Sequence, residues 1–181
     1  MNAARGTQPA ASDVERQQAA LHANSLALLV AGAAALLSLL GSLIMAAAGA
    51  GWIASAPYIL ISSATPPLFA LAFWWMVSRW EVSRSIREHR GAAALLVAIA
   101  VLVTVFSWSI AGFSPFYAVF LFLVGVRTKS GALLGYALLA ALVTFATGAL
   151  PLPLAAAAYV VFAAACAFSA WRLGVPRIGG K

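Results

Sequence analysis

Charged residues are scarce in this 181-residue chain: Asp, Glu, Lys and Arg together make up 8% of it, whereas 64% is hydrophobic. Soluble domains carry about 25% charged residues, so a soluble globule of this composition would lack the polar surface needed to cover itself. Apolar runs fill nearly all of the stretch 25–171, and a membrane-spanning helix needs about 20 such residues. The composition therefore predicts an all-α, polytopic membrane protein.

Ionisable side chains are missing from the apolar runs. The acids and histidines all lie in the N-terminal tail or in the charged segment between two runs: Asp13, Glu15, His22, Glu81, Glu88 and His89. Proton relays and charged-substrate sites need ionisable groups at bilayer depth, and acid–base catalysis needs a titratable group beside the substrate. We therefore predict that the protein is not an enzyme. A rim site built from Glu81, Glu88 and His89 is the alternative, but their spacing matches no motif and favours solvated loop charges.

Cysteine occurs once, as Cys166 in the last apolar run. A single cysteine excludes an internal disulfide and a cysteine-based metal cluster, and a thiol without polar activators is unreactive. We expect a buried, inert thiol and no metal or other cofactor.

Six apolar runs separated by charge or turn residues are the expected spans. They are about Ser25–Ala48, Pro57–Ser78, Gly91–Ile110, about Pro115–Val126, Gly131–Gly148 and Leu154–Trp171. The chain then divides into a tail (1–24) with a short helix from about Asp13, a bundle (25–173) and a second tail (174–181).

The placement of the basic residues supports this count. All eleven Lys and Arg residues fall in the N-terminal tail, in the loops after spans two and four, or after the end of span six, and the other three loops carry no charge. Positively charged loops stay in the cytoplasm. This pattern predicts a protein of the bacterial cytoplasmic membrane with both termini inside.

The fourth run is the weak point of the six-span prediction. A helix of about thirteen residues is only about 20 Å long at 1.5 Å per residue, which is less than the hydrocarbon core. The alternative is a five-span protein in which residues 113–126 form a re-entrant loop. That arrangement would place Arg127, Lys129 or the C-terminal arginines outside the cell.

Small residues recur at helix-packing spacing in two runs. One ridge consists of Ala27, Ala31 and Ala35, and the other of Gly131 and Gly135. Such ridges allow two helix backbones to approach closely within a membrane. They predict either packing inside the bundle or docking of a partner protein.

The stretch Ser62-Ser63-Ala64-Thr65-Pro66-Pro67 lies near the middle of the second run. Each proline lacks an N–H, so the carbonyls of Ser62 and Ser63 lose their helical partners. A broken helix at bilayer depth persists only where protein or water satisfies its backbone, and in many transporters such breaks bind substrate. We predict either a kink covered by neighbouring hydroxyls or a substrate site formed by Ser62, Ser63, Thr65, Pro66 and Pro67.

Two functions follow from these features. The first is a non-catalytic accessory or partner subunit that docks through its small-residue ridges. The second is a small carrier or channel for a neutral or weakly polar molecule bound near Pro66-Pro67. The expected surroundings are the lipid bilayer and a membrane protein partner or a second copy of the chain, and we expect no nucleic acid.

Overall fold

The computed structural model describes residues 13–48, 52–85, 89–106 and 114–174, and at 48, 52–62, 105 and 106 it describes the backbone alone. This part of the chain forms six α-helices and no strand. They are α1 (Asp13–Ala48), α2 (Trp52–Ser83), α3 (Arg90–Phe106), α4 (Phe116–Thr128), α5 (Gly131–Ala149) and α6 (Leu152–Gly174). The predicted all-α fold is confirmed.

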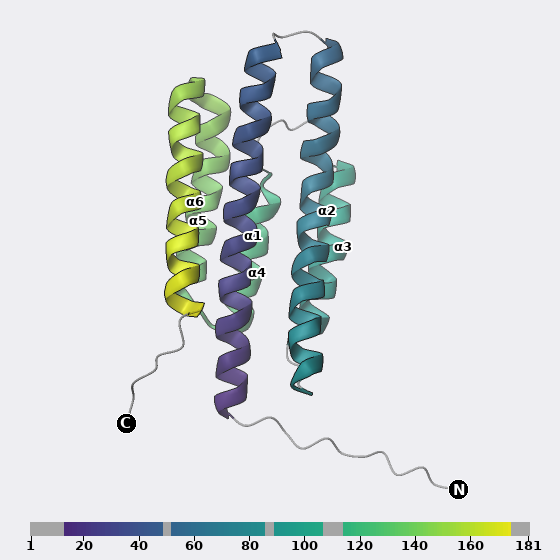
Figure 1. Cartoon of the computed structure of the whole chain (residues 1–181), viewed down its shortest axis with the longest axis vertical. Helices are drawn as coiled ribbons and strands as arrows, with labels where there is room; N and C mark the ends of the chain where they lie inside the picture. The colour runs from purple at the N-terminus through teal and green to yellow at the C-terminus, as the bar shows by residue number, and fades with distance from the viewer. Residues whose placement is uncertain (1–12, 49–51, 86–88, 107–113, 175–181) are drawn as a thin grey trace, which may run out of the picture.

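The helices pack in two layers. α6, α1 and α2 lie side by side, and α5, α4 and α3 lie behind them (Figure 1). α1 is central because it contacts α6, α2 and α4, whereas α3 and α4 barely touch. Successive helices alternate in direction, so the starts of α1, α3 and α5 lie at the same end of the bundle as the ends of α2, α4 and α6.

Local sequence sets the helix ends. The described part of α1 begins at Asp13 and runs without interruption into the first predicted span, with Asp13 and Glu15 in its first turn, where acidic groups interact favourably with the helix dipole. Between α4 and α5, Lys129 adopts a left-handed conformation (φ 53°). There the Ser130 N–H donates to the Gly125 carbonyl at 2.9 Å, and the Ser130 hydroxyl accepts from the Leu133 N–H. This pairing turns the chain within two residues.

Aromatic rings fill the core between α2 and α4. Phe73 meets Phe120 edge-on, with ring centroids 5.0 Å apart, and Phe116 lies 5.8 Å from Phe120. All three rings are buried. Cys166 is also buried, as expected.

Three described helices are long and apolar enough to cross a membrane, not six. They are α1, α5 and α6, while α3 and α4 are shorter apolar helices. α4 has thirteen residues, so it covers about 20 Å, the length that made the fourth span uncertain from the sequence.

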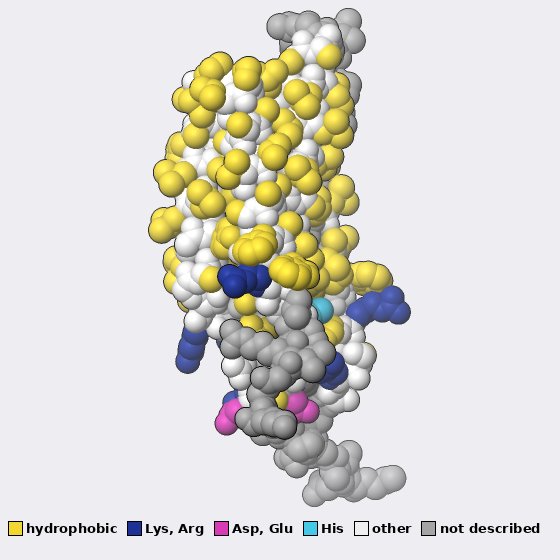
Figure 2. All heavy atoms as spheres, turned by 60° about the vertical axis from the view of Figure 1, so that its left-hand side comes forward, with side chains coloured by type: hydrophobic (Ala, Val, Ile, Leu, Met, Phe, Trp, Pro, Cys, Tyr) yellow, Lys and Arg dark blue, Asp and Glu magenta, His cyan; other side chains and the backbone are white. Residues whose placement is uncertain are grey.

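Hydrophobic side chains cover most of the visible face of the bundle, and charged side chains gather toward its lower end (Figure 2). This lower end holds the start of α1 and the ends of α2, α4 and α6. The described basic residues all belong to it: Arg16, Arg79, Arg84, Arg90, Arg127, Lys129 and Arg172. We call it the charged end.

Candidate functional site

The proline pair does not break α2. The helix is continuous from Trp52 to Ser83 and passes through Pro66 and Pro67. This corrects the broken helix on which the substrate-site alternative was based, and it agrees with the other alternative, in which neighbouring hydroxyls cover the freed backbone. The Ser63 carbonyl, which cannot pair with Pro67, accepts the Thr104 hydroxyl of α3 at 3.1 Å. The same hydroxyl lies 2.8 Å from the Ala100 carbonyl in its own helix. The single hydroxyl proton of Thr104 is therefore shared between its own helix and the carbonyl that the proline leaves open.

Further side chains close around this point. Pro66 is buried, and the Thr65 side chain lies beside the Tyr117 hydroxyl of α4. Tyr117 is itself buried and meets Phe69 edge-on at 6.3 Å. Hydroxyls from α2, α3 and α4 thus lie close to one another beside the proline pair. The Ser62 side chain lies outside the described residues.

The two small-residue ridges have different surroundings. Ala27, Ala31 and Ala35 are fully buried within the bundle. In the same helix, a Cβ added to Gly32 would lie 3.2 Å from the Cβ of Cys166. The ridge is therefore covered inside the bundle, and its interpretation as a partner-docking surface gives way to packing within the chain.

The second ridge faces outward. Gly131 and Gly135 are exposed, and a Cβ added to either would meet nothing within 4 Å. Leu138, Leu142 and Phe145 continue the line at alternating spacings of three and four residues, and they are 66–78% exposed. We call these five residues the outer stripe of α5. A stripe with this spacing is the kind that packs along a second helix.

Glu81 departs from the expected solvated loop charge. It lies inside α2 and is 1% exposed. Its carboxylate accepts the backbone N–H groups of His89 at 2.6 Å and Arg90 at 3.1 Å, so it binds the start of α3. The sequence did contain the signal, because Ala70, Phe73, Val77 and Glu81 share one helix face and the first three are buried. Glu88 lies outside the described residues.

A second cluster joins α1 to α2 at the charged end. The His22 ring stacks on Trp80 with centroids 4.7 Å apart, and the Arg84 guanidinium lies 4.6 Å from the same indole. Arg84 also donates to the Gln18 amide oxygen at 3.0 Å. Burial lowers the pKa of His22 below its usual 6.5, and the positive charge of Arg84 lowers it further. This cluster therefore favours the neutral form of the His22 imidazole beside an arginine.

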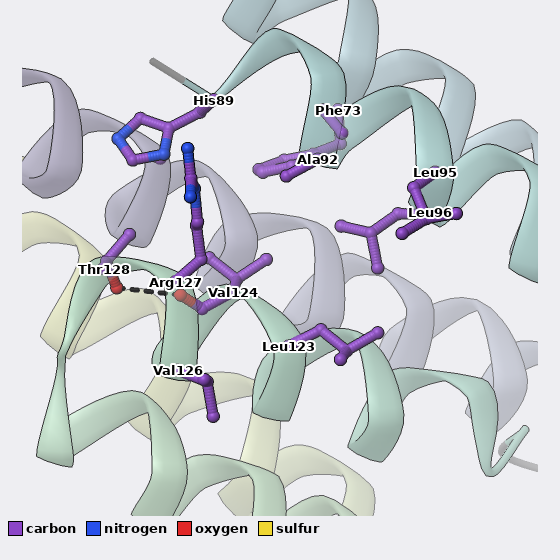
Figure 3. Close-up of a pocket in the computed structure, with 12 residues that line it drawn as sticks. Phe73, His89, Ala92, Leu95, Leu96, Leu123, Val124, Val126, Arg127 and Thr128 are labelled. Carbon is purple, nitrogen blue, oxygen red and sulfur yellow. Dashed lines mark hydrogen bonds between the residues drawn. The ribbon is translucent and has the colours of Figure 1, made fainter.

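A cavity of about 210 Å³ lies between α3 and α4 at the charged end. Most of its lining is apolar and comes from four helices, with Ala23 from α1 and Phe73 from α2. His89 and Arg127 stand at one end, and Leu95 and Leu96 lie toward the other (Figure 3). Sequence reasoning did not identify this cavity, because it arises from the wide separation of two neighbouring helices.

The described residues contain no group of three or more His, Cys, Asp or Glu side chains that could hold a metal ion. No protein-family model, no curated protein and no solved structure matches the chain.

Proposed function

We propose that the chain is a six-span protein of the bacterial cytoplasmic membrane, with both termini in the cytoplasm, and that it acts as a non-catalytic accessory or partner subunit. The observation that carries the proposal is the outer stripe of α5, where two glycines leave open space beside three exposed large apolar residues. The partner would be a transmembrane helix that crosses α5 near Gly135.

Aromatic and basic side chains at the charged end support the membrane position. The Arg79 guanidinium lies 5.0 Å from the Trp75 ring centroid, and that of Arg172 lies 5.4 Å from the Phe168 ring centroid. Both rings are more than half exposed. Aromatic rings favour the headgroup region, and basic residues favour the cytoplasmic side. Together they support a cytoplasmic interface at this level of the bundle.

Docking at α5 has a physical basis. Lipid offers no hydrophobic drive for association, so membrane helices associate where small residues let their backbones approach. Gly131 and Gly135 are exposed and provide such an approach on α5, while the Ala27–Ala35 ridge is already used inside the bundle. The stripe is therefore the surface best suited to a partner helix.

The test compares Gly135→Leu with Ala98→Leu, a matched control at an exposed position on α3. The wild type and both variants are cross-linked in native membranes and purified in mild detergent. The mass of each purified species is then measured by light scattering. We expect wild type and Ala98→Leu to retain a cross-linked partner, and Gly135→Leu to lose it without a change in thermal stability. Equal cross-linking of all three, or a wild type that is always a single chain, would contradict docking at α5. A partner with the mass of the chain itself would identify a homo-oligomer.

A carrier or channel for a small neutral molecule is the second candidate. The observation that favours it is the convergence of Thr65, Thr104 and Tyr117 on the backbone beside Pro67. If these groups bind substrate, Thr65→Val should abolish an uptake phenotype while the protein stays folded, because the change keeps the shape and removes the hydroxyl. If they only join the helices, Thr65→Val lowers thermal stability and leaves the phenotype of the folded protein intact.

A further inference from the structure

The cavity between α3 and α4 is a half-open cleft with one polar end. Its walls are the N-terminal part of α3 and the C-terminal part of α4, and residues of α1 and α2 form its floor. Alanines at three lining positions, Ala23, Ala92 and Ala93, provide the space. Leu95 and Val126 flank it and are more than half exposed, so the cleft opens toward the surroundings of the bundle.

The polar end coincides with the charged end of the bundle. His89 precedes α3, and Arg127 lies in the last turn of α4 with its side chain directed toward His89 (Figure 3). The Thr128 hydroxyl donates to the Val124 carbonyl at 2.9 Å, so the Arg127 guanidinium and the His89 ring define this end. From Arg90 to Leu96 the apolar wall extends roughly 9 Å along α3, at 1.5 Å per residue.

We propose that this cleft binds one acyl chain of an anionic phospholipid, with the lipid phosphate held by Arg127. An arginine binds phosphate through two parallel N–H···O hydrogen bonds. Arg90 and Lys129 lie at the same end of the bundle, and the chain carries a net charge of +7, so the surroundings favour a negatively charged headgroup. The apolar part of the cleft then lies at the depth of the acyl chains.

The size of the cleft selects this occupant. Pockets for drug-sized molecules measure about 300–1,000 Å³, and a helix with side chains is about 10 Å across. A space of about 210 Å³ fits part of a single extended acyl chain. It is too small for a drug-sized molecule or for a helix of a partner protein. The inference assumes the membrane location of the bundle, but it is independent of docking at α5.

Binding is measured by native mass spectrometry on delipidated full-length protein in detergent. The probes are palmitoyl-oleoyl phosphatidylglycerol, phosphatidylcholine with the same chains, and oleate. We expect tight binding of one phosphatidylglycerol, at least tenfold weaker binding of phosphatidylcholine, and weaker binding of oleate, which lacks the phosphate. The loss of a charged hydrogen bond predicts a reduction on the order of tenfold or more for Arg127→Gln, with partial recovery in Arg127→Lys.

Two further variants separate the cleft from general basic charge. Ala92→Phe fills the cleft from a half-buried position and should reduce phosphatidylglycerol binding, whereas Arg172→Gln, which removes an arginine from α6, should not. Thermal melts establish that each variant is folded. Equal reductions in Arg127→Gln and Arg172→Gln, or unchanged binding in Ala92→Phe, would overturn the proposal. Equal binding of phosphatidylglycerol and oleate would also overturn it. So would the finding that Ala92→Phe still binds lipid but no longer co-purifies with a protein that accompanies the wild type.

Discussion

At the scale of single residues, Glu81 connects two helices that the sequence separates by a charged segment. The first backbone N–H groups of a helix have no partner within it, and a buried donor left unpaired costs about 1–3 kcal/mol. The Glu81 carboxylate accepts two such groups at the start of α3. The positive end of the helix dipole also favours a negative charge at this position.

Replacing Glu81 tests this role. Glu81→Ala should destabilise the protein by about 1–3 kcal/mol, because it removes the shared acceptor of two partly buried N–H groups. Glu81→Gln should lose less stability than Glu81→Ala, since its amide oxygen still accepts one of the two hydrogen bonds. Thermal unfolding in detergent measures both, with Glu15→Ala, an exposed acid in the first turn of α1, as the control. A Glu81→Ala protein as stable as the Glu15→Ala control would contradict the assignment.

His22 makes stability depend on pH. Its pKa is lower in the folded chain than its usual 6.5, so the unfolded chain binds more protons between those two values. The contribution of His22 is present above about pH 6.5 and is lost as pH falls toward the folded pKa. Wild type should therefore lose more thermal stability between pH 7.5 and pH 5.5 than His22→Phe, which keeps a ring against Trp80. If the thermal stabilities of wild type and His22→Phe changed equally between pH 7.5 and pH 5.5, this account would be contradicted.

The sequence revealed some of these residues better than others. Cys166 was predicted to be buried because it lies in an apolar run. Glu81 was missed because arginines surround it in the sequence, although its spacing from Phe73 and Val77 places it on a buried face. The alanine ridge of α1 was recognised, but its spacing alone does not distinguish packing inside the bundle from packing against a partner.

At the scale of the helices, Gly125 sets the approach of α4 to α5. A Cβ at this position would lie 3.0 Å from the Leu133 Cβ and 3.2 Å from the Leu134 backbone nitrogen. Neither atom can move without shifting α5. The short turn between α4 and α5 therefore requires glycine one turn before the end of α4.

Gly125→Ala and Gly135→Ala form a matched pair. Alanine is favoured over glycine by about 0.8–1.0 kcal/mol in a helix interior, and Gly135 has open space, so Gly135→Ala should be neutral or stabilising. At Gly125, overpacking costs about 1–3 kcal/mol and should offset or exceed that gain. Differential scanning fluorimetry should thus rank Gly125→Ala below Gly135→Ala. The reverse order would show that α4 and α5 are not closely packed there.

Helix boundaries could largely be predicted from the sequence, because the apolar runs end at helix breakers such as Pro115 or at charged residues. The continuity of α2 through Pro66 and Pro67 could not be predicted in this way. Whether a proline pair interrupts a helix depends on what satisfies the freed carbonyls, and the hydroxyl that satisfies Ser63 comes from Thr104, 41 residues away. Local pattern contains no information about that contact.

At the scale of the whole molecule, the order of the helices in space was beyond sequence reasoning. α1 pairs with α6, and the Ser25 hydroxyl donates to the Ala170 carbonyl across 145 residues. The cavity follows from the same arrangement, since α3 and α4 adjoin in sequence yet barely touch. By contrast, the position of the basic residues at one end could be predicted. Successive helices alternate in direction, and the basic residues lie in every second loop, so these loops meet at the same end of the bundle.

Membrane topology is the measurement that tests the proposed account most directly. Alkaline phosphatase and fluorescent-protein fusions at Thr128, Leu152 and Lys181 report the side of the membrane on which each position lies. A six-span bundle with a cytoplasmic charged end predicts a cytoplasmic signal at Thr128 and Lys181 and an external signal at Leu152. An external signal at Thr128 together with a cytoplasmic one at Leu152 would show that α4 does not cross the membrane, and would contradict the six-span bundle.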